Sequence, residues 1–122
     1  MMLDHKHIII RAEVNKPPTD IRKIKKQIKK LIKSLGMKPL GRAVSVYVSK
    51  EGNKGLTCVQ PIETSHIALH SWDECEPALL QLDVYTCSKL DKKTVFNWFE
   101  IFEPKDINYL TIDRKDYIKI EK

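Results

Sequence analysis

The stretch HIIIRAEVNKPPTDIRKIKKQIKKLIKSLG, residues 7–36, contains a strand pattern followed by a helix pattern. Residues 7–14 are rich in β-branched side chains and stop before two prolines, which predicts a strand that ends in a turn. After Thr19, the predicted N-cap, apolar residues recur at helical spacing until Gly36, a residue type that commonly ends helices. The chain is therefore expected to begin with a strand and an amphipathic helix.

The polar face of this predicted helix is almost entirely basic. Most of the chain's net charge of +6 lies on it, in Arg22, Lys23, Lys25, Lys26, Lys29, Lys30 and Lys33. A solvated surface helix and a phosphate contact with nucleic acid both fit this pattern. No aromatic residue is interleaved with the lysines and no nucleic-acid motif occurs elsewhere, so we favour the solvated helix and do not expect a nucleic-acid partner.

The rest of the chain alternates between strand and turn signals around one more helix. Strand patterns occur at 43–50, 56–62, 65–72 and 79–87, and turn residues join the first two strands into a hairpin. Residues 91–102 predict a helix with Asp91 as its N-cap, which ends before Pro104. The C-terminal tail predicts one more strand or a short hairpin.

Strand, helix, several strands, helix and strand is the element order of an α+β fold. We expect a two-layer α/β sandwich with both helices on one face of a mainly antiparallel sheet. Several strands carry Ile and Val at both odd and even positions, so apolar side chains point to both faces of the sheet. This makes the face without helices apolar enough to pair with another subunit. A homodimer that forms a four-layer αββα sandwich is therefore predicted.

Length and composition limit the classes of protein to consider. At 122 residues and 42% hydrophobic content, a single domain over residues 1–122 is expected. No apolar run approaches the roughly 18 residues of a membrane span, and the N-terminal residues lack a signal-peptide pattern. Three cysteines without CxxC spacing argue against a disulfide framework or a four-cysteine zinc site. These features predict a cytoplasmic protein without a membrane partner.

The segment ETSHIALHSWDE, residues 63–74, gathers reactive side chains, and Cys87 follows on the next predicted strand. His66 and His70 share one face of a strand and, with a nearby carboxylate, suit a metal ion. Alternatively, Cys87 or Ser65 suits a nucleophile that one of the histidines activates. A purely structural interpretation is also open, with hydrogen-bonded histidines and a buried cysteine. Composition alone does not rank the three.

The pattern S-H-I-x-L-H-S-W-x-E (65–74), followed by L-D-V-Y-T-C (82–87), resembles the processing-site and active-site strands of prokaryotic S-adenosylmethionine decarboxylases. Members of this family cut their own chain and keep a pyruvoyl group at the new N-terminus. The resemblance implies cleavage between Thr64 and Ser65, with the pyruvoyl cofactor derived from Ser65. Its carbonyl serves as the electron sink in decarboxylation of an amine substrate, as PLP does in other enzymes.

The same resemblance implies roles for four further residues. His70 assists β-elimination during processing, and Thr57, at the place of a family serine, aids processing. Cys87 protonates the decarboxylated carbon as general acid. Glu74 binds the substrate or orders the site, and no metal ligand is implied. Because Ser65 and His70 differ in strand parity, a bend or bulge near the cleavage point is required.

The expected function is thus pyruvoyl-dependent decarboxylation of S-adenosylmethionine for polyamine (spermidine) synthesis, which would make the protein a lyase. One alternative is a decarboxylase of another amino acid such as arginine, because positions near the site, including Arg11, depart from the family pattern. The other alternative is a non-cleaving relative that acts as a binding or regulatory protein. Thr64 supports this last interpretation, since the family has glutamate there.

Overall fold

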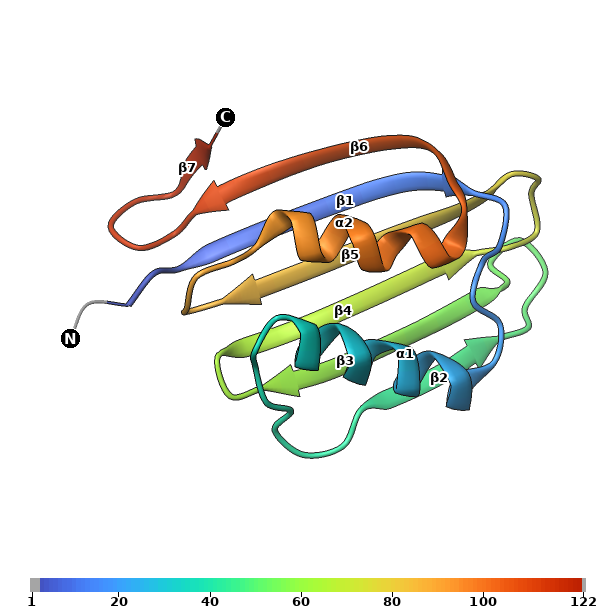
Figure 1. The fold of residues 1–122 in the computed structure, drawn as a ribbon. Helices are drawn as coiled ribbons and strands as arrows, with labels where there is room; N and C mark the ends of the chain where they lie inside the picture. Colours follow the sequence, from blue (N-terminus) through green and yellow to red (C-terminus); the bar gives the residue numbers. More distant parts are fainter. Residues whose placement is uncertain (1–2, 122) are drawn as a thin grey trace.

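In the computed structural model, which describes residues 3–121, one antiparallel sheet of seven strands carries two helices. The strands are β1 (Lys6–Val14), β2 (Val44–Val48), β3 (Gly55–Ile62), β4 (Ser65–Trp72), β5 (Ala78–Thr86), β6 (Pro104–Asp113) and β7 (Lys119–Glu121). Their spatial order is β2-β3-β4-β5-β1-β6-β7. The N-terminal strand β1 therefore lies inside the sheet, between β5 and β6 (Figure 1).

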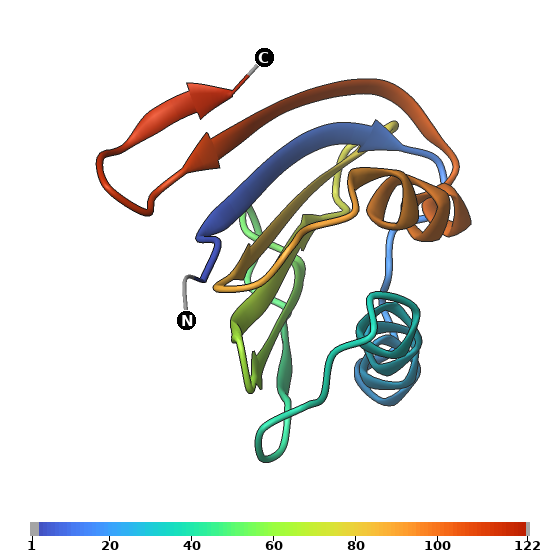
Figure 2. The same ribbon diagram turned by 60° about the vertical axis from the view of Figure 1, so that its left-hand side comes forward.

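The helices are α1 (Ile21–Ser34) and α2 (Lys92–Phe99), and a 3-10 turn, η1 (Glu100–Phe102), extends α2. Both helices lie on the same side of the curved sheet (Figure 2). They are joined by a hydrogen bond of 2.7 Å from Trp98 Nε1 to the carbonyl oxygen of Gln27. The expected α+β fold, with an antiparallel sheet and two helices on one face, is confirmed.

The N-terminus of each helix is capped by an aspartate. Asp20 accepts hydrogen bonds from the N–H groups of Arg22 (2.9 Å) and Lys23 (3.1 Å), so Asp20 is the N-cap of α1. The prediction of Thr19 as this cap was wrong by one residue, because the Asp20 carboxylate is the group that reaches both donors. Asp91 caps α2 as predicted.

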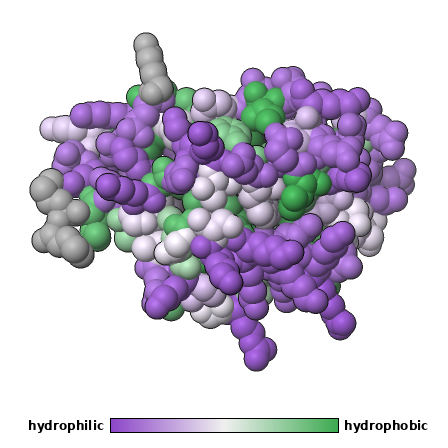
Figure 3. Space-filling model, viewed as in Figure 1, coloured by the Kyte–Doolittle hydropathy of each residue, from purple (hydrophilic) through white to green (hydrophobic). Residues whose placement is uncertain are grey.

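The core lies between the sheet and the two helices. Alternate side chains of each central strand are buried there, as β1 illustrates with Ile8 and Ile10, and α1 contributes its apolar stripe: Ile24, Ile28, Leu31 and Ile32. The outer side of the helix layer is mainly hydrophilic (Figure 3). The basic residues of α1 lie on this side, and all but the half-buried Lys25 are exposed.

The other face of the sheet is covered by no helix, and we call it the open face. In the five strands from β3 to β6 it is formed by Thr57, Val59, Pro61, His66, Ala68, His70, Trp72, Leu79, Gln81, Asp83, Tyr85, His7, Ile9, Arg11, Glu13, Asp106, Asn108, Leu110 and Ile112. Valines of the edge strand β2 extend it with apolar surface. The face is thus mixed, with charged and polar residues at its centre, and is less uniformly apolar than expected.

Candidate active site

Ser65 and Cys87 lie close together although they are far apart in the chain. Ser65 opens β4 and is the register partner of Thr86, the last residue of β5. Cys87 follows directly, and its backbone N–H donates a hydrogen bond of 2.7 Å to the carbonyl oxygen of Thr64. The carbonyl of the bond expected to be cleaved is therefore held by the backbone of the expected proton donor.

The backbone is strained at Ser65. Its φ of 140° lies in a region that residues other than glycine rarely adopt. The chain enters this residue from a turn at Glu63 and Thr64 and continues beyond it as a regular strand. The pairing of β4 with its neighbours shows no bulge at this point, so the expected bulge is absent and the irregularity is confined to the backbone angle of Ser65, the residue that the family resemblance nominates for processing.

The side chain of Thr64 ends in a buried hydroxyl group. Its Oγ1 atom is shielded from solvent and has no hydrogen-bond partner among residues 3–121. Leaving a buried polar group unsatisfied costs about 1–3 kcal/mol, so such atoms are uncommon in native proteins. The side chain of Glu63, one residue earlier, is exposed instead.

Thr57 and His70 form a hydrogen-bonded pair on the open face. They are register partners on β3 and β4, and Thr57 Oγ1 lies 3.0 Å from His70 Nδ1. A hollow of about 140 Å³ beside them is also lined by Trp72. The hydrogen bond restrains the imidazole ring at Nδ1, so Nε2 is the ring atom left for proton transfer.

His70 lies too far along β4 to reach Ser65 of the same chain. The two residues are five positions apart on one strand. Since a strand rises about 3.3 Å per residue, their Cα atoms are separated by about 16 Å. One chain therefore brings Ser65 and Cys87 together but holds the Thr57–His70 pair away from both.

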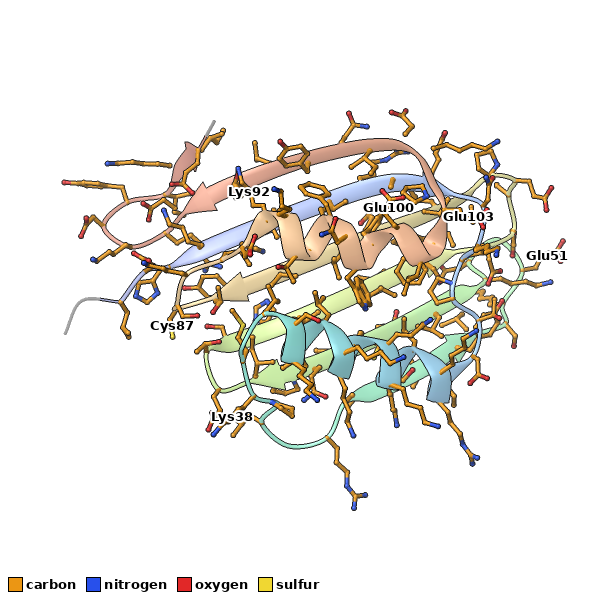
Figure 4. The ribbon with its side chains drawn as sticks, viewed as in Figure 1. Lys38, Glu51, Cys87, Lys92, Glu100 and Glu103 are labelled. Carbon is orange, nitrogen blue, oxygen red and sulfur yellow. The ribbon has the colours of Figure 1, made fainter. Side chains whose placement is uncertain are left out.

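Glu74 lies beyond the end of β4 that is farthest from the cleavage point. Its Oε1 accepts hydrogen bonds from the backbone N–H groups of Gly52 (2.7 Å) and Lys54 (3.3 Å), in the turn between β2 and β3. Figure 4 shows Glu51 of this turn and Cys87 at opposite ends of the sheet. These contacts order the β2–β3 turn, and a role of Glu74 in substrate binding stays a prediction.

The two residues that precede Glu74 contact this turn and the strand β2 before it. Trp72 Nε1 donates a hydrogen bond of 3.1 Å to Asn53 Oδ1. Tyr47 donates its hydroxyl to the carboxylate of Asp73, with distances of 2.9 and 2.8 Å to the two oxygens. This hydrogen bond is the main cause that raises the pKa of Tyr47 above its ordinary value.

A cluster of polar and aromatic residues lies on the open face near the Ser65 end of β4. We call it the histidine cluster, and it consists of His7, His66, Asp83, Tyr85 and Arg114. His7 Nε2 is hydrogen-bonded to Asp83 Oδ1, and His66 Nε2 lies 3.9 Å from the same oxygen. The guanidinium carbon of Arg114 lies 3.9 Å from the centre of the Tyr85 ring.

From the sequence, only His66 of this cluster was considered as a reactive side chain, although Asp83 and Tyr85 belong to the L-D-V-Y-T-C motif. Asp83 and Tyr85 have the same strand parity and precede Cys87 closely, which is the signal that could have placed them on one face beside the site. The position of Arg114 carries no such signal, because it follows β6 and approaches Tyr85 only through the pairing of strands.

The metal interpretation finds no support in the geometry. His66 and His70 do share the open face, but within residues 3–121 no group of three or more His, Cys, Asp or Glu residues is placed to hold a metal ion. In the same part of the chain, no helix is long and apolar enough to cross a membrane.

The sequence matches the family model described as S-adenosylmethionine decarboxylase over residues 6–115. A curated relative, the S-adenosylmethionine decarboxylase proenzyme of Archaeoglobus fulgidus, is 34% identical over 62 residues, which cover 49% of this chain and 54% of the relative. The match thus spans about half the length of that relative.

A solved structure extends the similarity to the whole fold. The adenosylmethionine decarboxylase from Aquifex aeolicus VF5 matches with a TM-score of 0.74, covering 100% of this chain and 98% of that one. The two sequences are 20% identical, so this likeness concerns the fold alone.

Proposed function

Because the chain belongs to the S-adenosylmethionine decarboxylase family, we propose that it cleaves itself between Thr64 and Ser65 and then decarboxylates S-adenosylmethionine. The observation that carries this proposal is the hydrogen bond from the Cys87 N–H to the Thr64 carbonyl, at a strained serine. A nucleophile, a polarised carbonyl and local strain meet at one peptide bond. These are the requirements for an intramolecular acyl shift.

The first step transfers the Thr64 acyl group from nitrogen to oxygen. Ser65 Oγ attacks the Thr64 carbonyl carbon and forms a C–O bond, the C–N bond to Ser65 breaks, and the hydroxyl proton passes to the Ser65 nitrogen. Negative charge develops on the Thr64 carbonyl oxygen, where the Cys87 N–H already donates. The backbone strain at Ser65 raises the energy of the reactant and is relieved when the C–N bond breaks.

The second step eliminates the acyl group. A base removes the Cα proton of Ser65, the Cβ–Oγ bond breaks, and Thr64 leaves as a carboxylate. The enamine left behind tautomerises to an imine, and water hydrolyses it to the pyruvoyl group with release of ammonia. His70 is the candidate base, and its contact with Thr57 restrains the ring for this task.

Because His70 and Ser65 of one chain are far apart, we propose that a second copy supplies the histidine. A homodimer that packs two open faces together would place the Thr57–His70 pair of one subunit near Ser65 of the other. The open face carries exposed apolar side chains that such packing would bury, among them Ile9 (41% exposed), Val46 (49%) and Leu110 (38%).

The chemistry after maturation uses the substrate amine. The pyruvoyl group supplies an electron-accepting carbonyl, so that carbon dioxide can leave the carbon next to the amine. The thiol of Cys87, on the residue whose N–H contacts the processing site, is the candidate donor of the proton that replaces it. We propose that this cytoplasmic reaction supplies the aminopropyl donor for spermidine synthesis.

The test is the intact mass of freshly purified, denatured protein, with Ser65→Ala as control. Two fragments, residues 1–64 and a pyruvoyl-blocked 65–122, are expected for the wild type and none for the control. Release of labelled carbon dioxide from S-adenosylmethionine, compared with arginine, then identifies the substrate. A single 14.2 kDa species that persists on long incubation would instead favour the non-cleaving binding or regulatory protein.

A further inference from the structure

The hydroxyl of Thr64 lies at the cleavage point, and the mechanism above does not use it. It is carried by the same residue as the carbonyl that Ser65 attacks, so it stays next to the reacting atoms throughout. It is shielded from solvent and has no hydrogen-bond partner among the described residues. Buried donors without a partner are uncommon in native proteins, so this hydroxyl calls for an explanation.

We propose that this hydroxyl promotes self-cleavage by donating a hydrogen bond to the oxygen atoms of its own acyl group. These oxygens gain negative charge twice, when Ser65 attacks the carbonyl and when Thr64 leaves as a carboxylate. Threonine hydroxyls commonly hydrogen-bond to backbone groups of their own residue, so the contact is sterically accessible. The inference rests on the proposed self-cleavage, in which the Thr64 hydroxyl would stabilise the charge that develops on the acyl oxygens.

The physical reason is differential stabilisation. An interaction that is absent in the reactant and present in the transition state lowers the barrier, whereas one present in both does not. The Cys87 N–H already contacts the Thr64 carbonyl in the uncleaved chain, so part of its effect is present before the reaction starts. The unpaired hydroxyl of Thr64 makes its hydrogen bond only as charge develops, so its whole effect acts on the rate.

The neighbouring carboxylate is a poorer candidate for this task. Glu63 is the acidic residue nearest in sequence to the cleavage point, but its side chain is exposed. A carboxylate near the developing oxyanion would also repel it, whereas a neutral hydroxyl donor stabilises it. The hydroxyl therefore suits the processing step better than the adjacent acid does.

The test compares Thr64→Val, which has nearly the same shape without the hydroxyl, with Thr64→Ser, which keeps the hydroxyl. Cleavage is followed by intact mass after denaturation, and stability by the melting temperature of each chain in a Ser65→Ala background, where no cleavage occurs. We expect Thr64→Val to cleave about 10- to 100-fold more slowly than the wild type. This slowing is smaller than the slowing that follows removal of a fully preorganised oxyanion donor, because the Cys87 N–H remains. Thr64→Ser should stay close to the wild-type rate.

A purely structural role for Thr64 predicts a different pattern. Removing an unsatisfied buried hydroxyl should leave the melting temperature unchanged or raise it. Slower cleavage in a chain that is equally or more stable therefore supports the inference. Thr111→Val is the matched control, because it removes a buried hydroxyl of β6 away from the cleavage point and should leave the cleavage rate unchanged.

Three outcomes would overturn the inference. Thr64→Val could cleave at the wild-type rate, or Thr64→Val and Thr64→Ser could be slowed equally, which would show that keeping the hydroxyl does not preserve the cleavage rate. If Thr64→Val fails to fold, Thr64→Ala is the second variant without the hydroxyl. Self-cleavage of Thr64→Ala at the wild-type rate would likewise overturn the inference. A wild-type chain that never cleaves removes the proposed function as well, whereas the first two outcomes leave that proposal intact.

Discussion

Cys87 contributes two groups to the candidate site, and substitution can separate them. Its backbone N–H contacts the Thr64 carbonyl, while its thiol is the proposed proton donor. Cys87→Ala keeps the N–H, so we expect it to cleave itself at close to the wild-type rate. Its decarboxylation rate should fall by about 10²- to 10⁴-fold, the usual contribution of general acid catalysis.

Two measurements check this separation of roles. Intact mass follows the cleavage of Cys87→Ala, and release of labelled carbon dioxide follows its turnover. If the variant stays uncleaved, the thiol itself takes part in processing and the assignment of that role to the backbone is wrong. If turnover is unchanged, another group protonates the product.

The three cysteines should differ in reactivity. Cys58 is buried in the core, and burial raises the pKa of its thiol, against the smaller opposing effect of the charge of Lys25. Cys75 is exposed. Because the thiolate is the reactive form, iodoacetamide should label Cys75 quickly and Cys58 only after unfolding. Mass spectrometry of peptides from native and unfolded protein measures both, and fast native labelling of Cys58 would contradict its burial.

At the scale of elements, the pairing of β3 with β4 depends on a glycine. A Cβ atom at Gly55 would lie 1.7 Å from the carbonyl oxygen of Ser71, so the two strands approach too closely there for any side chain. Gly55→Ala should lower the free energy of unfolding by about 3 kcal/mol or more, because the strands must separate. Urea denaturation measures the loss, and an unchanged midpoint would show that the strands adjust without strain.

The N-terminus of α1 should make stability depend on pH. The hydrogen bonds from Lys23 and Arg22 hold the pKa of Asp20 below its ordinary value of 3.8. Because the pKa of Asp20 is lower in the folded state than in the unfolded state, its charge stabilises the fold at pH values above the unfolded-state pKa. This contribution is lost as the pH falls through the folded-state pKa. Asp20→Asn keeps a capping side chain but does not titrate.

Thermal melting between about pH 2 and pH 6 tests this prediction. The melting temperature of the wild type should exceed that of Asp20→Asn most at the upper end of this pH range, and the difference in melting temperature should shrink towards the lower end. A difference that does not change with pH would mean that the Asp20 charge contributes nothing to folding.

At the scale of the whole molecule, the separation of His70 from Ser65 predicts complementation between subunits. His70→Ala keeps Ser65 but lacks the proposed base, and Ser65→Ala keeps the proposed base but lacks the serine at which cleavage is proposed. Each variant alone should stay whole. After they are mixed and allowed to exchange subunits, the His70→Ala chain should be cleaved, because its partner supplies the histidine.

Intact mass identifies which chain is cleaved in the mixture. Wild-type chains mixed with Ser65→Ala serve as the control for subunit exchange. If His70→Ala cleaves alone, the histidine is not the base. If the mixture stays whole although subunits exchange, the base acts within one chain and the proposed packing of open faces is wrong.

Local sequence patterns determined the elements of this fold. The strand expected at 65–72 has those bounds in the structure, the strand expected at 56–62 begins one residue earlier, and the strand expected at 79–87 both begins and ends one residue earlier. The helix from 91 to 102 appears as α2 followed by η1, because the last turn tightens. Such patterns are readable because hydrophobic period, caps and turn residues all act within a few positions of the chain.

The sequence alone also indicated the family and the candidate residues, since Ser65, His70 and Cys87 occur in a recognisable order. Only the tertiary structure decided which of them meet. Strand register places the Cys87 N–H on the Thr64 carbonyl, and the regular rise of β4 keeps His70 away from both. The reason is that contacts between strands depend on pairing across the sheet, which the spacing of residues within one strand does not encode.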